Sequence, residues 1–204
     1  MSKLSISILS VVAVGVVTLT TSIAAANVTS AFMDTGQETS QPIGHYEFCQ
    51  HLPAECSVQN GASLPVALDE GSWTQLQFIN NLVNEAIQPA TDEEMFGTPE
   101  VWSFPSIRGD CEDYVLLKRR LLVEHGWPIG ALLITVVLRP DGSGHAVLTV
   151  RTDRGDLVLD NLTPQIRVWT ETPYRFVKRQ SDRDTGRWVA ILNGGGGDVR
   201  FVGN

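Results

Sequence analysis

The chain has 204 residues, of which 43% are hydrophobic, and this is enough for one domain with a sizeable core. Its formal net charge at pH 7 is −8, which does not favour nucleic acid or an anionic membrane surface as a partner. The charge is uneven, because residues 27–113 hold fourteen acidic side chains and a single basic one, Arg108. Either two lobes of opposite charge face each other, or the acidic half contains a cation site.

Residues 1–26 have the pattern of a secretory signal peptide. Lys3 supplies the positive start, residues 6–19 form a mostly apolar run, and three alanines at 24–26 offer a cleavage site. The run is shorter than the roughly 20 residues of a membrane span. We therefore expect cleavage and a periplasmic or secreted protein without membrane attachment, the alternative being a retained N-terminal anchor.

The remaining chain is expected to form one domain with two flexible ends. Residues 27–44 are polar and rich in turn formers, which predicts a linker or arm. Residues 45–192 contain the periodic segments and form the predicted domain. Residues 193–204 include four consecutive glycines and are expected to be a flexible tail.

Cysteine usage fits an exported protein. Cys49 and Cys56 lie seven residues apart, and an oxidising compartment favours a disulfide between them. The alternative is a zinc site with His45 and His51, although their spacing matches none of the usual zinc patterns. The disulfide leaves Cys111 free, and a free thiol in such a compartment is either well buried or functional.

Two helices precede the predicted strands. Apolar side chains recur every three or four positions over residues 72–87, with the first residue as the predicted N-cap. Residues 91–105 are expected to form a long loop. The second helix begins after Asp110, the predicted N-cap, with Asp113 at the N3 position of a capping box. It ends near His125-Gly126, a basic last turn followed by a C′ glycine.

The second half of the chain has the short-period pattern of strands. Strands are expected at residues 131–138, 145–150, 156–160, 166–169, 174–178 and 188–192. Helices followed by consecutive strands predict an α+β fold with an antiparallel sheet.

Three residues form a candidate catalytic group: Cys111 at a helix start, His145 at the start of a strand, and Asp160 at the end of the next. The two strands form a hairpin about the turn at residues 152–155. In one register His145 faces Asp160; in the other it opposes Leu162, and Asp160 is its diagonal neighbour on the same face. In either register an imidazole lies beside a carboxylate.

This group suits nucleophilic catalysis. An imidazole can take the proton of a thiol, and a carboxylate on the other ring nitrogen fixes the tautomer and stabilises the imidazolium. The N-terminus of a helix favours a sulfur anion and offers N–H groups for an oxyanion. Taken singly, each residue has a structural reading: a small core cysteine, a hydrogen-bonded histidine, and a turn aspartate.

The order of three motifs resembles a known family. G-D-C-E-D-Y at residues 109–114, G-H-A-V-L at 144–148 and L-D-N at 159–161 resemble the bacterial transglutaminase-like cysteine proteinases, which include the LapG-type periplasmic proteases. The resemblance covers residues 48–192. It implies a papain-like, transglutaminase-core fold in which the helix that carries the nucleophile packs on the antiparallel sheet.

The resemblance also implies roles for individual residues. Cys111 would be the nucleophile, His145 the general base and then acid, and Asp160 the orienting acid. LapG-type members depend on calcium, which would involve Asp110, Glu112 and Asp113. The alternative is that these acids only cap the helix, yet three carboxylates beside a thiol oppose its ionisation unless a cation neutralises them.

The sequence therefore predicts an exported cysteine peptidase that cleaves periplasmic or surface proteins, with a surface adhesin as one substrate that the resemblance suggests. One alternative is transglutaminase or amidase chemistry on protein glutamine. Another is a non-catalytic periplasmic binding module on the same fold. The sequence leaves the oligomeric state open.

Overall fold

The computed structural model describes residues 30–58 and 64–195. The predicted signal peptide and most of the predicted tail lie outside these residues. The helices are α1 (Ile43–His51), α2 (Pro53–Cys56), α3 (Glu70–Ala86), α4 (Asp92–Phe96) and α5 (Cys111–Glu124), with 3₁₀ turns η1 (Ile129–Ala131) and η2 (Trp169–Glu171). The strands are β1 (Thr35–Thr39), β2 (Gln88–Pro89), β3 (Arg108–Gly109), β4 (Leu132–Leu138), β5 (Gly144–Thr152), β6 (Gly155–Leu159), β7 (Arg167–Val168), β8 (Arg175–Gln180) and β9 (Trp188–Ile191).

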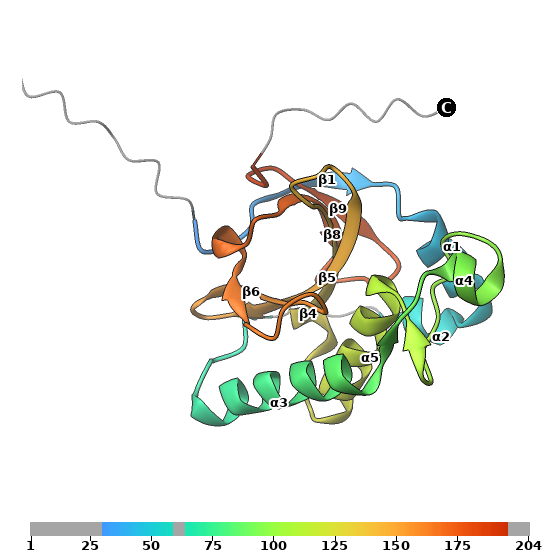
Figure 1. Cartoon of the computed structure of the whole chain (residues 1–204). Helices are drawn as coiled ribbons and strands as arrows, with labels where there is room; N and C mark the ends of the chain where they lie inside the picture. Colours follow the sequence, from blue (N-terminus) through green and yellow to red (C-terminus); the bar gives the residue numbers. More distant parts are fainter. Residues whose placement is uncertain (1–29, 59–63, 196–204) are drawn as a thin grey trace, which may run out of the picture.

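A strongly curved sheet of seven strands is the centre of the fold (Figure 1). Its order is β1-β9-β8-β4-β5-β6-β7, and every neighbouring pair is antiparallel. A separate, parallel pair joins β2 to β3 just before α5. The predicted α+β class, with the Cys111 helix packed on an antiparallel sheet, is confirmed.

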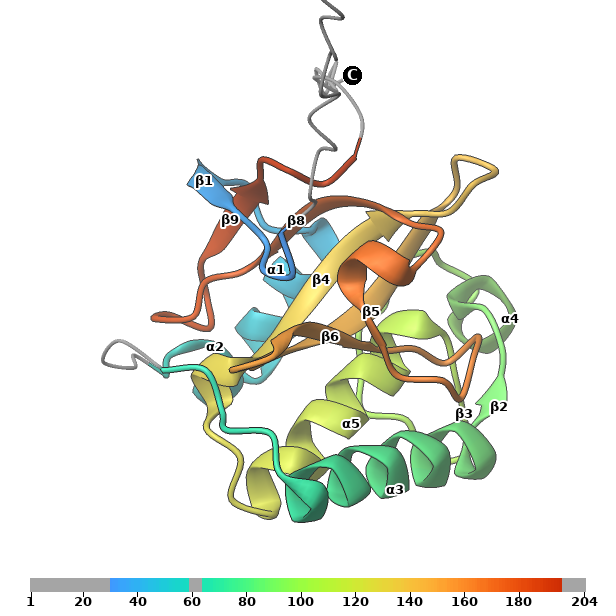
Figure 2. The ribbon, with the colours of Figure 1, turned by 90° about the vertical axis from the view of Figure 1, so that its left-hand side faces the viewer.

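The helices cover one face of this sheet. Figure 2 shows α5 between the sheet and α3, so α5 is enclosed on both sides. The strands alternate between two apolar clusters, as the two-residue period of a strand requires. On β5, Leu148 and Val150 pack toward the helices, whereas Val147 packs into a smaller cluster on the other face with Trp169 and Phe176. Burial on both faces makes β5 and β6 a rigid base for the hairpin that carries His145.

The start of α3 differs from the prediction. The N-cap is Asp69, whose Oδ1 accepts from the Ser72 backbone N–H at 2.8 Å. The Ser72 hydroxyl accepts in return from the Asp69 N–H at 2.8 Å. Ser72 is therefore the N3 partner of a capping box, because the box satisfies two free N–H groups where a lone serine cap would satisfy one.

The predicted linker at residues 27–44 is in part an ordered edge of the domain. Thr35–Thr39 forms β1, which pairs with β9. The Asp34 carbonyl accepts from the Leu192 N–H at 2.8 Å, and α1 follows at Ile43. An edge strand is held by its backbone, and most side chains of β1 are exposed, so no apolar alternation marked it.

The predicted loop at residues 91–105 contains the short helix α4. Thr91 Oγ1 accepts from the Glu94 N–H at 3.3 Å, and Glu94 Oε2 accepts from the Thr91 N–H at 3.0 Å. Gly97 ends the helix with φ 69°, a left-handed conformation that suits glycine. Among the helices of the described residues, none is long and apolar enough to cross a membrane.

Candidate active site

Cys111 is the first residue of α5, directly after β3 and the N-cap Asp110. Gly109 allows the chain to pass close to the helix, since a Cβ there would lie 2.8 Å from the Asp113 side chain. The predicted capping box is wrong: the Asp110 side chain makes no capping hydrogen bond. Asp113 Oδ1 instead accepts from the Ser103 backbone N–H at 2.8 Å, because that segment offers it a donor from outside the helix.

The Cys111 thiol is half-buried and donates a hydrogen bond to Glu112 Oε2 at 2.9 Å. Burial raises the pKa of the thiol, and the charge and hydrogen bond of Glu112 raise it further. A hydrogen bond from the Ala146 backbone N–H acts in the opposite direction and is outweighed. The thiol is therefore neutral in this arrangement, and the neighbouring acid opposes its ionisation.

The β5–β6 hairpin brings His145 and Asp160 together. Leu148 pairs with Leu159, so the register is the one in which His145 opposes the position of Leu162 and Asp160 is its diagonal neighbour. His145 Nε2 and Asp160 Oδ1 lie 2.9 Å apart, and both side chains are buried. The second ring nitrogen, Nδ1, is the one left for the thiol.

Three further groups hold Asp160. The Tyr174 hydroxyl donates to Oδ2 at 2.5 Å, the Leu162 N–H donates to Oδ1 at 3.0 Å, and the Asn84 amide donates to the Asp160 backbone carbonyl at 2.9 Å. Burial opposes ionisation of Asp160, but hydrogen bonds from His145, Tyr174 and Leu162 outweigh it and lower the pKa of the carboxyl. Sequence reasoning gave Tyr174 and Asn84 no role, although an asparagine beside the apolar face of a helix is a signal of a buried polar contact.

Lys118, on the same helix as Cys111, is completely buried. Its Nζ has no hydrogen-bond partner among the described residues and lies 5.9 Å from the ring centroid of Tyr114. Burial lowers the pKa of Lys118 to about 7, while the negative charge of Asp160 acts to raise it. A basic group thus lies within electrostatic reach of Asp160.

A cluster of carboxylates adjoins the start of α5. Asp92, Asp110 and Asp113 each place an oxygen within 4.8 Å of the others. One buried oxygen of each (Oδ1, Oδ1 and Oδ2, respectively) accepts no hydrogen bond within the described part of the chain. Burial, followed by the charge of Glu112, raises the pKa of Asp110 to about 9, and burial raises that of Asp113 to about 7. Burial also raises the pKa of Asp92.

The composition of this cluster differs from the predicted set in one member. Glu112 is turned toward the Cys111 thiol, and Asp92 joins Asp110 and Asp113 instead. Asp92 was missed because it belongs to α4, inside the segment predicted to be a loop. The signal that could have found it is the capping pattern T-D-E-E at residues 91–94.

Two cavities meet at Cys111 and His145, both of which line each of them. The larger, of about 590 Å³, is lined by the apolar side chains of Ile43, Trp102, Val136, Leu138 and Val177 and by the charged residues Glu100, Asp110, Glu112 and Lys178. The smaller, of about 380 Å³, extends to Arg139, Asn161 and Leu162. A polypeptide crossing this cleft would have space on both sides of the thiol.

Cys49 and Cys56 form a disulfide, with their Cα atoms 5.6 Å apart. His45, the nearest residue of the zinc alternative, lies beside it with Nε2 at 3.8 Å from Cys49 Sγ and 3.9 Å from Cys56 Sγ. His51 is exposed and its Nδ1 contacts the Glu47 carbonyl. Cys111 is the free cysteine of the described residues.

Comparison with known proteins identifies the family of this chain. Residues 35–195 match the family described as bacterial transglutaminase-like cysteine proteinase BTLCP. The chain belongs to this family. Family membership, together with the fold, supports a transglutaminase-like cysteine peptidase. A search of curated proteins found no match.

Solved structures of LapG from Legionella pneumophila are similar to this member of the family. The calcium-bound LapG structure has 26% sequence identity and a TM-score of 0.50, over 58% of this chain and 68% of LapG. A further LapG structure has 27% identity and a TM-score of 0.49, over 57% and 66% of the two chains. The EGTA-treated form has 27% identity and a TM-score of 0.49, over 58% and 67%.

Proposed function

We propose that this protein is an exported cysteine peptidase with Cys111 as nucleophile, His145 as general base and then acid, and Asp160 as the orienting acid. One observation carries the proposal: His145 Nε2 donates to Asp160 Oδ1 at 2.9 Å within a cleft that Cys111 also lines. Family membership supports the same chemistry. The predicted periplasmic or secreted location follows from the signal-peptide pattern and is part of the proposal.

In the proposed reaction, the Cys111 thiol turns from Glu112 to His145 Nδ1 and gives up its proton. The sulfur then attacks the carbonyl carbon of the scissile peptide bond, and N–H groups at the start of α5 stabilise the oxyanion. The imidazolium, held by Asp160, donates its proton to the leaving amine as the C–N bond breaks. Water, deprotonated by His145, finally hydrolyses the thioester and releases the acid.

Tyr174 and Asn84 support Asp160 in this scheme. Both act through Asp160, one on its carboxylate and the other on its backbone carbonyl. A carboxylate that accepts three hydrogen bonds keeps its charge and its orientation when the neighbouring imidazole becomes charged. We therefore regard both residues as positioning residues.

We propose calcium as the cation of the Asp92, Asp110 and Asp113 cluster. Buried carboxylate oxygens without donors suit a hard cation that binds oxygen ligands. A bound calcium ion would neutralise these acids and thereby reduce their opposition to ionisation of the Cys111 thiol. The calcium-bound form of LapG is consistent with this assignment.

The substrate we propose is a protein of the periplasm or cell surface, with a surface adhesin as one candidate. Terminus labelling of periplasmic and surface proteins, compared between wild type and Cys111→Ala, would identify the cleaved bonds. We expect new protein termini in the wild type that disappear in Cys111→Ala and in His145→Ala.

A matched control separates catalysis from folding. His125, an exposed histidine at the end of α5, can be changed to alanine without affecting the cleft. His125→Ala should retain the cleavage pattern of the wild type. Identical termini in wild type and Cys111→Ala, with both proteins folded, would overturn the proposal. Isopeptide-linked products that release ammonia would instead indicate acyl transfer.

A further inference from the structure

The larger cavity beside Cys111 is lined in part by apolar side chains that have no role in the proposed reaction. It holds about 590 Å³, within the range of roughly 300–1,000 Å³ that is typical of ligand-binding pockets. Three apolar side chains of the sheet, Val136, Leu138 and Val177, line it beside Lys178, and Ile43 of α1 lines it as well. The four other than Lys178 are apolar, although the cavity opens beside several acids.

A break in the sheet register builds this wall. On β4, Val136 pairs with Lys178 and Val137 pairs with Phe176, so Val177 has no partner opposite it and forms a bulge in β8. A bulge turns its side chain out of the regular alternation, and bulges are frequent beside active sites. Phe176 is buried in the cluster on the far face, whereas Val177 lines the cavity.

The opposite side of the cavity contains one exposed residue, Ile43, and one residue that is fixed by its neighbours, Trp102. Ile43 begins α1 and is 61% exposed, a large apolar side chain at the cavity with little packing of its own. Trp102 is fixed by close contact with α1, because a Cβ at Gly44 would lie 2.4 Å from its Cδ1 atom. The indole therefore forms a rigid boundary of the cavity.

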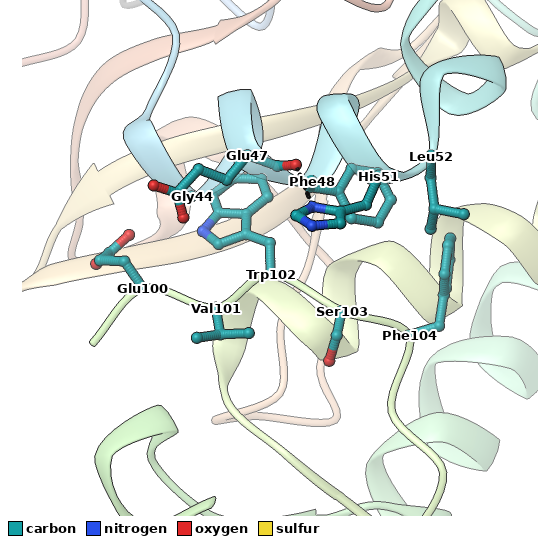
Figure 3. A pocket seen from close by; sticks show the side chains of 10 residues that line it. All are labelled: Gly44, Glu47, Phe48, His51, Leu52, Glu100, Val101, Trp102, Ser103 and Phe104. Atoms are coloured by element: carbon teal, nitrogen blue, oxygen red, sulfur yellow. Dashed lines mark hydrogen bonds between the residues drawn. The ribbon is translucent and has the colours of Figure 1, made fainter. Parts of the chain in front are cut away.

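A second cavity lies beside Trp102. Trp102 and Glu100 also line a neighbouring cavity of about 320 Å³, between α1 and residues 100–104. Figure 3 shows Trp102 in the middle of that cavity, with Leu52 and Phe104 at one end and Glu100 at the other. Glu100 has φ 62°, an uncommon conformation for a residue other than glycine, at the boundary of the two cavities.

We propose that the cavity bounded by Ile43, Val136 and Val177 is a specificity subsite that takes an apolar side chain of an extended polypeptide next to the scissile bond. This assignment rests on the proposed function, since the thiol defines where the bond lies. The polypeptide continues past Trp102 into the second cavity. The apolar wall favours an aliphatic or aromatic side chain over a polar one of equal length.

Thiol alkylation tests the subsite without requiring turnover. Cys111 is treated with two iodoacetamides of equal length, one with an N-hexyl tail and one with a neutral ether tail. Each second-order rate is followed by intact mass and divided by the rate of the same reagent with N-acetylcysteine. We expect the hexyl reagent to label Cys111 roughly 10- to 100-fold faster than the ether reagent, the discrimination typical of an apolar pocket.

Variants of Val177 test whether the difference between the two alkylation rates arises at this cavity. Val177→Asp should reduce the ratio of the two rates toward one, and the isosteric Val177→Thr should reduce it part of the way if the aspartate prevents folding. Phe78→Asp is the matched control, because Phe78 is an exposed apolar residue of α3 that lines neither cavity at the thiol. It should leave the ratio unchanged.

A ratio near one in the wild type, or an equal ratio in wild type and both Val177 variants, would overturn the subsite. A ratio reduced as much in Phe78→Asp as in Val177→Asp would also overturn it, because the effect would then not arise at the cavity. Because alkylation is measured, a protein that alkylates selectively but cleaves nothing would contradict the proposed function and leave the subsite supported.

Discussion

His45 makes the stability of the domain dependent on pH in a way that can be measured. Its side chain is 1% exposed, between the rings of Trp102 and Trp188. The Trp188 indole N–H donates to Nδ1 at 3.2 Å, so this nitrogen is an acceptor. A proton on Nδ1 would oppose that N–H group. Burial, followed by the charge of Arg119, lowers the pKa of His45 to about 4.

The direction of the pH effect follows from the protons that His45 binds in the unfolded and in the folded state. In the unfolded chain His45 binds a proton below pH 6.5, and in the folded protein only below about 4. The unfolded state therefore holds more protons between these values, and stability falls as the pH is lowered through this window. The loss at pH 5 is about 2 kcal/mol, approaching about 3 kcal/mol below pH 4.

The assay is urea unfolding of wild type and His45→Asn at pH 7 and pH 5. At pH 7 the variant should be less stable, because the smaller side chain loses the ring contacts with Trp102 and Trp188, although its amide oxygen can still accept from the Trp188 N–H. At pH 5 the difference should shrink by about 2 kcal/mol, since the variant has no imidazole to protonate. Protonation of Asp92, Asp110 and Asp113 also changes the free energy of unfolding with pH, but it does so equally in both proteins and cancels in their difference. His51→Asn, an exposed change on the same helix, is the control and should track the wild type. A difference that stays the same at both pH values would refute the reasoning.

Three other predictions concern the disulfide, the acid cluster and one turn. Replacing Cys49 and Cys56 by serine should lower the free energy of unfolding by about 2–3 kcal/mol, as measured in urea, because the bridge closes a loop with a sequence separation of 7. EGTA should lower the melting temperature of the calcium-loaded wild type but not that of Asp92→Asn, which lacks one proposed ligand charge. Gly155→Ala should destabilise the hairpin by about 1–3 kcal/mol in the same urea assay, because φ is +128° and a Cβ would lie 2.8 Å from the Ala31 carbonyl oxygen.

Each of these has an outcome that contradicts it. An unfolding free energy unchanged by loss of both cysteines would remove the disulfide from the stability of the domain. An equal response to EGTA in wild type and Asp92→Asn would exclude Asp92 as a ligand. A Gly155→Ala protein as stable as the wild type would mean that the turn relaxes to another conformation.

Local pattern was sufficient for the six strands from β4 to β9, and for the hairpin that joins His145 to Asp160. The two-residue period and the turn at residues 152–155 restricted the register to two choices, and both brought the pair together. The choice between them depends on the exact turn residues, which the pattern does not determine. The sequence alone therefore predicts that His145 and Asp160 lie side by side, but it does not determine the register of the hairpin.

Features held by tertiary contacts were not accessible in the same way. Thr35–Thr39 has no apolar alternation, since it is held by backbone bonds to β9 at the sheet edge. Asp113 satisfied the spacing of a capping box but accepts from Ser103, a partner ten positions away. The Tyr174 hydroxyl donates to Asp160 from fourteen positions further along the chain, beyond β7 and η2. Each case depends on where two separate segments meet.

The acids beside Cys111 connect the peptidase and cation parts of the proposal. Glu112 accepts the thiol hydrogen and stabilises the neutral thiol, so it competes with His145 for the same proton. Asp110 adds to the negative potential at the thiol when it is ionised, while burial raises the pKa of Asp110 to about 9 and that of Asp113 to about 7. A divalent cation among them would reverse the sign of this potential at the start of α5, where the helix already favours an anion. The cost of burying these acids is then offset when the cation binds, and the same binding favours the thiolate. Stability and thiol reactivity should therefore rise together as the cluster fills.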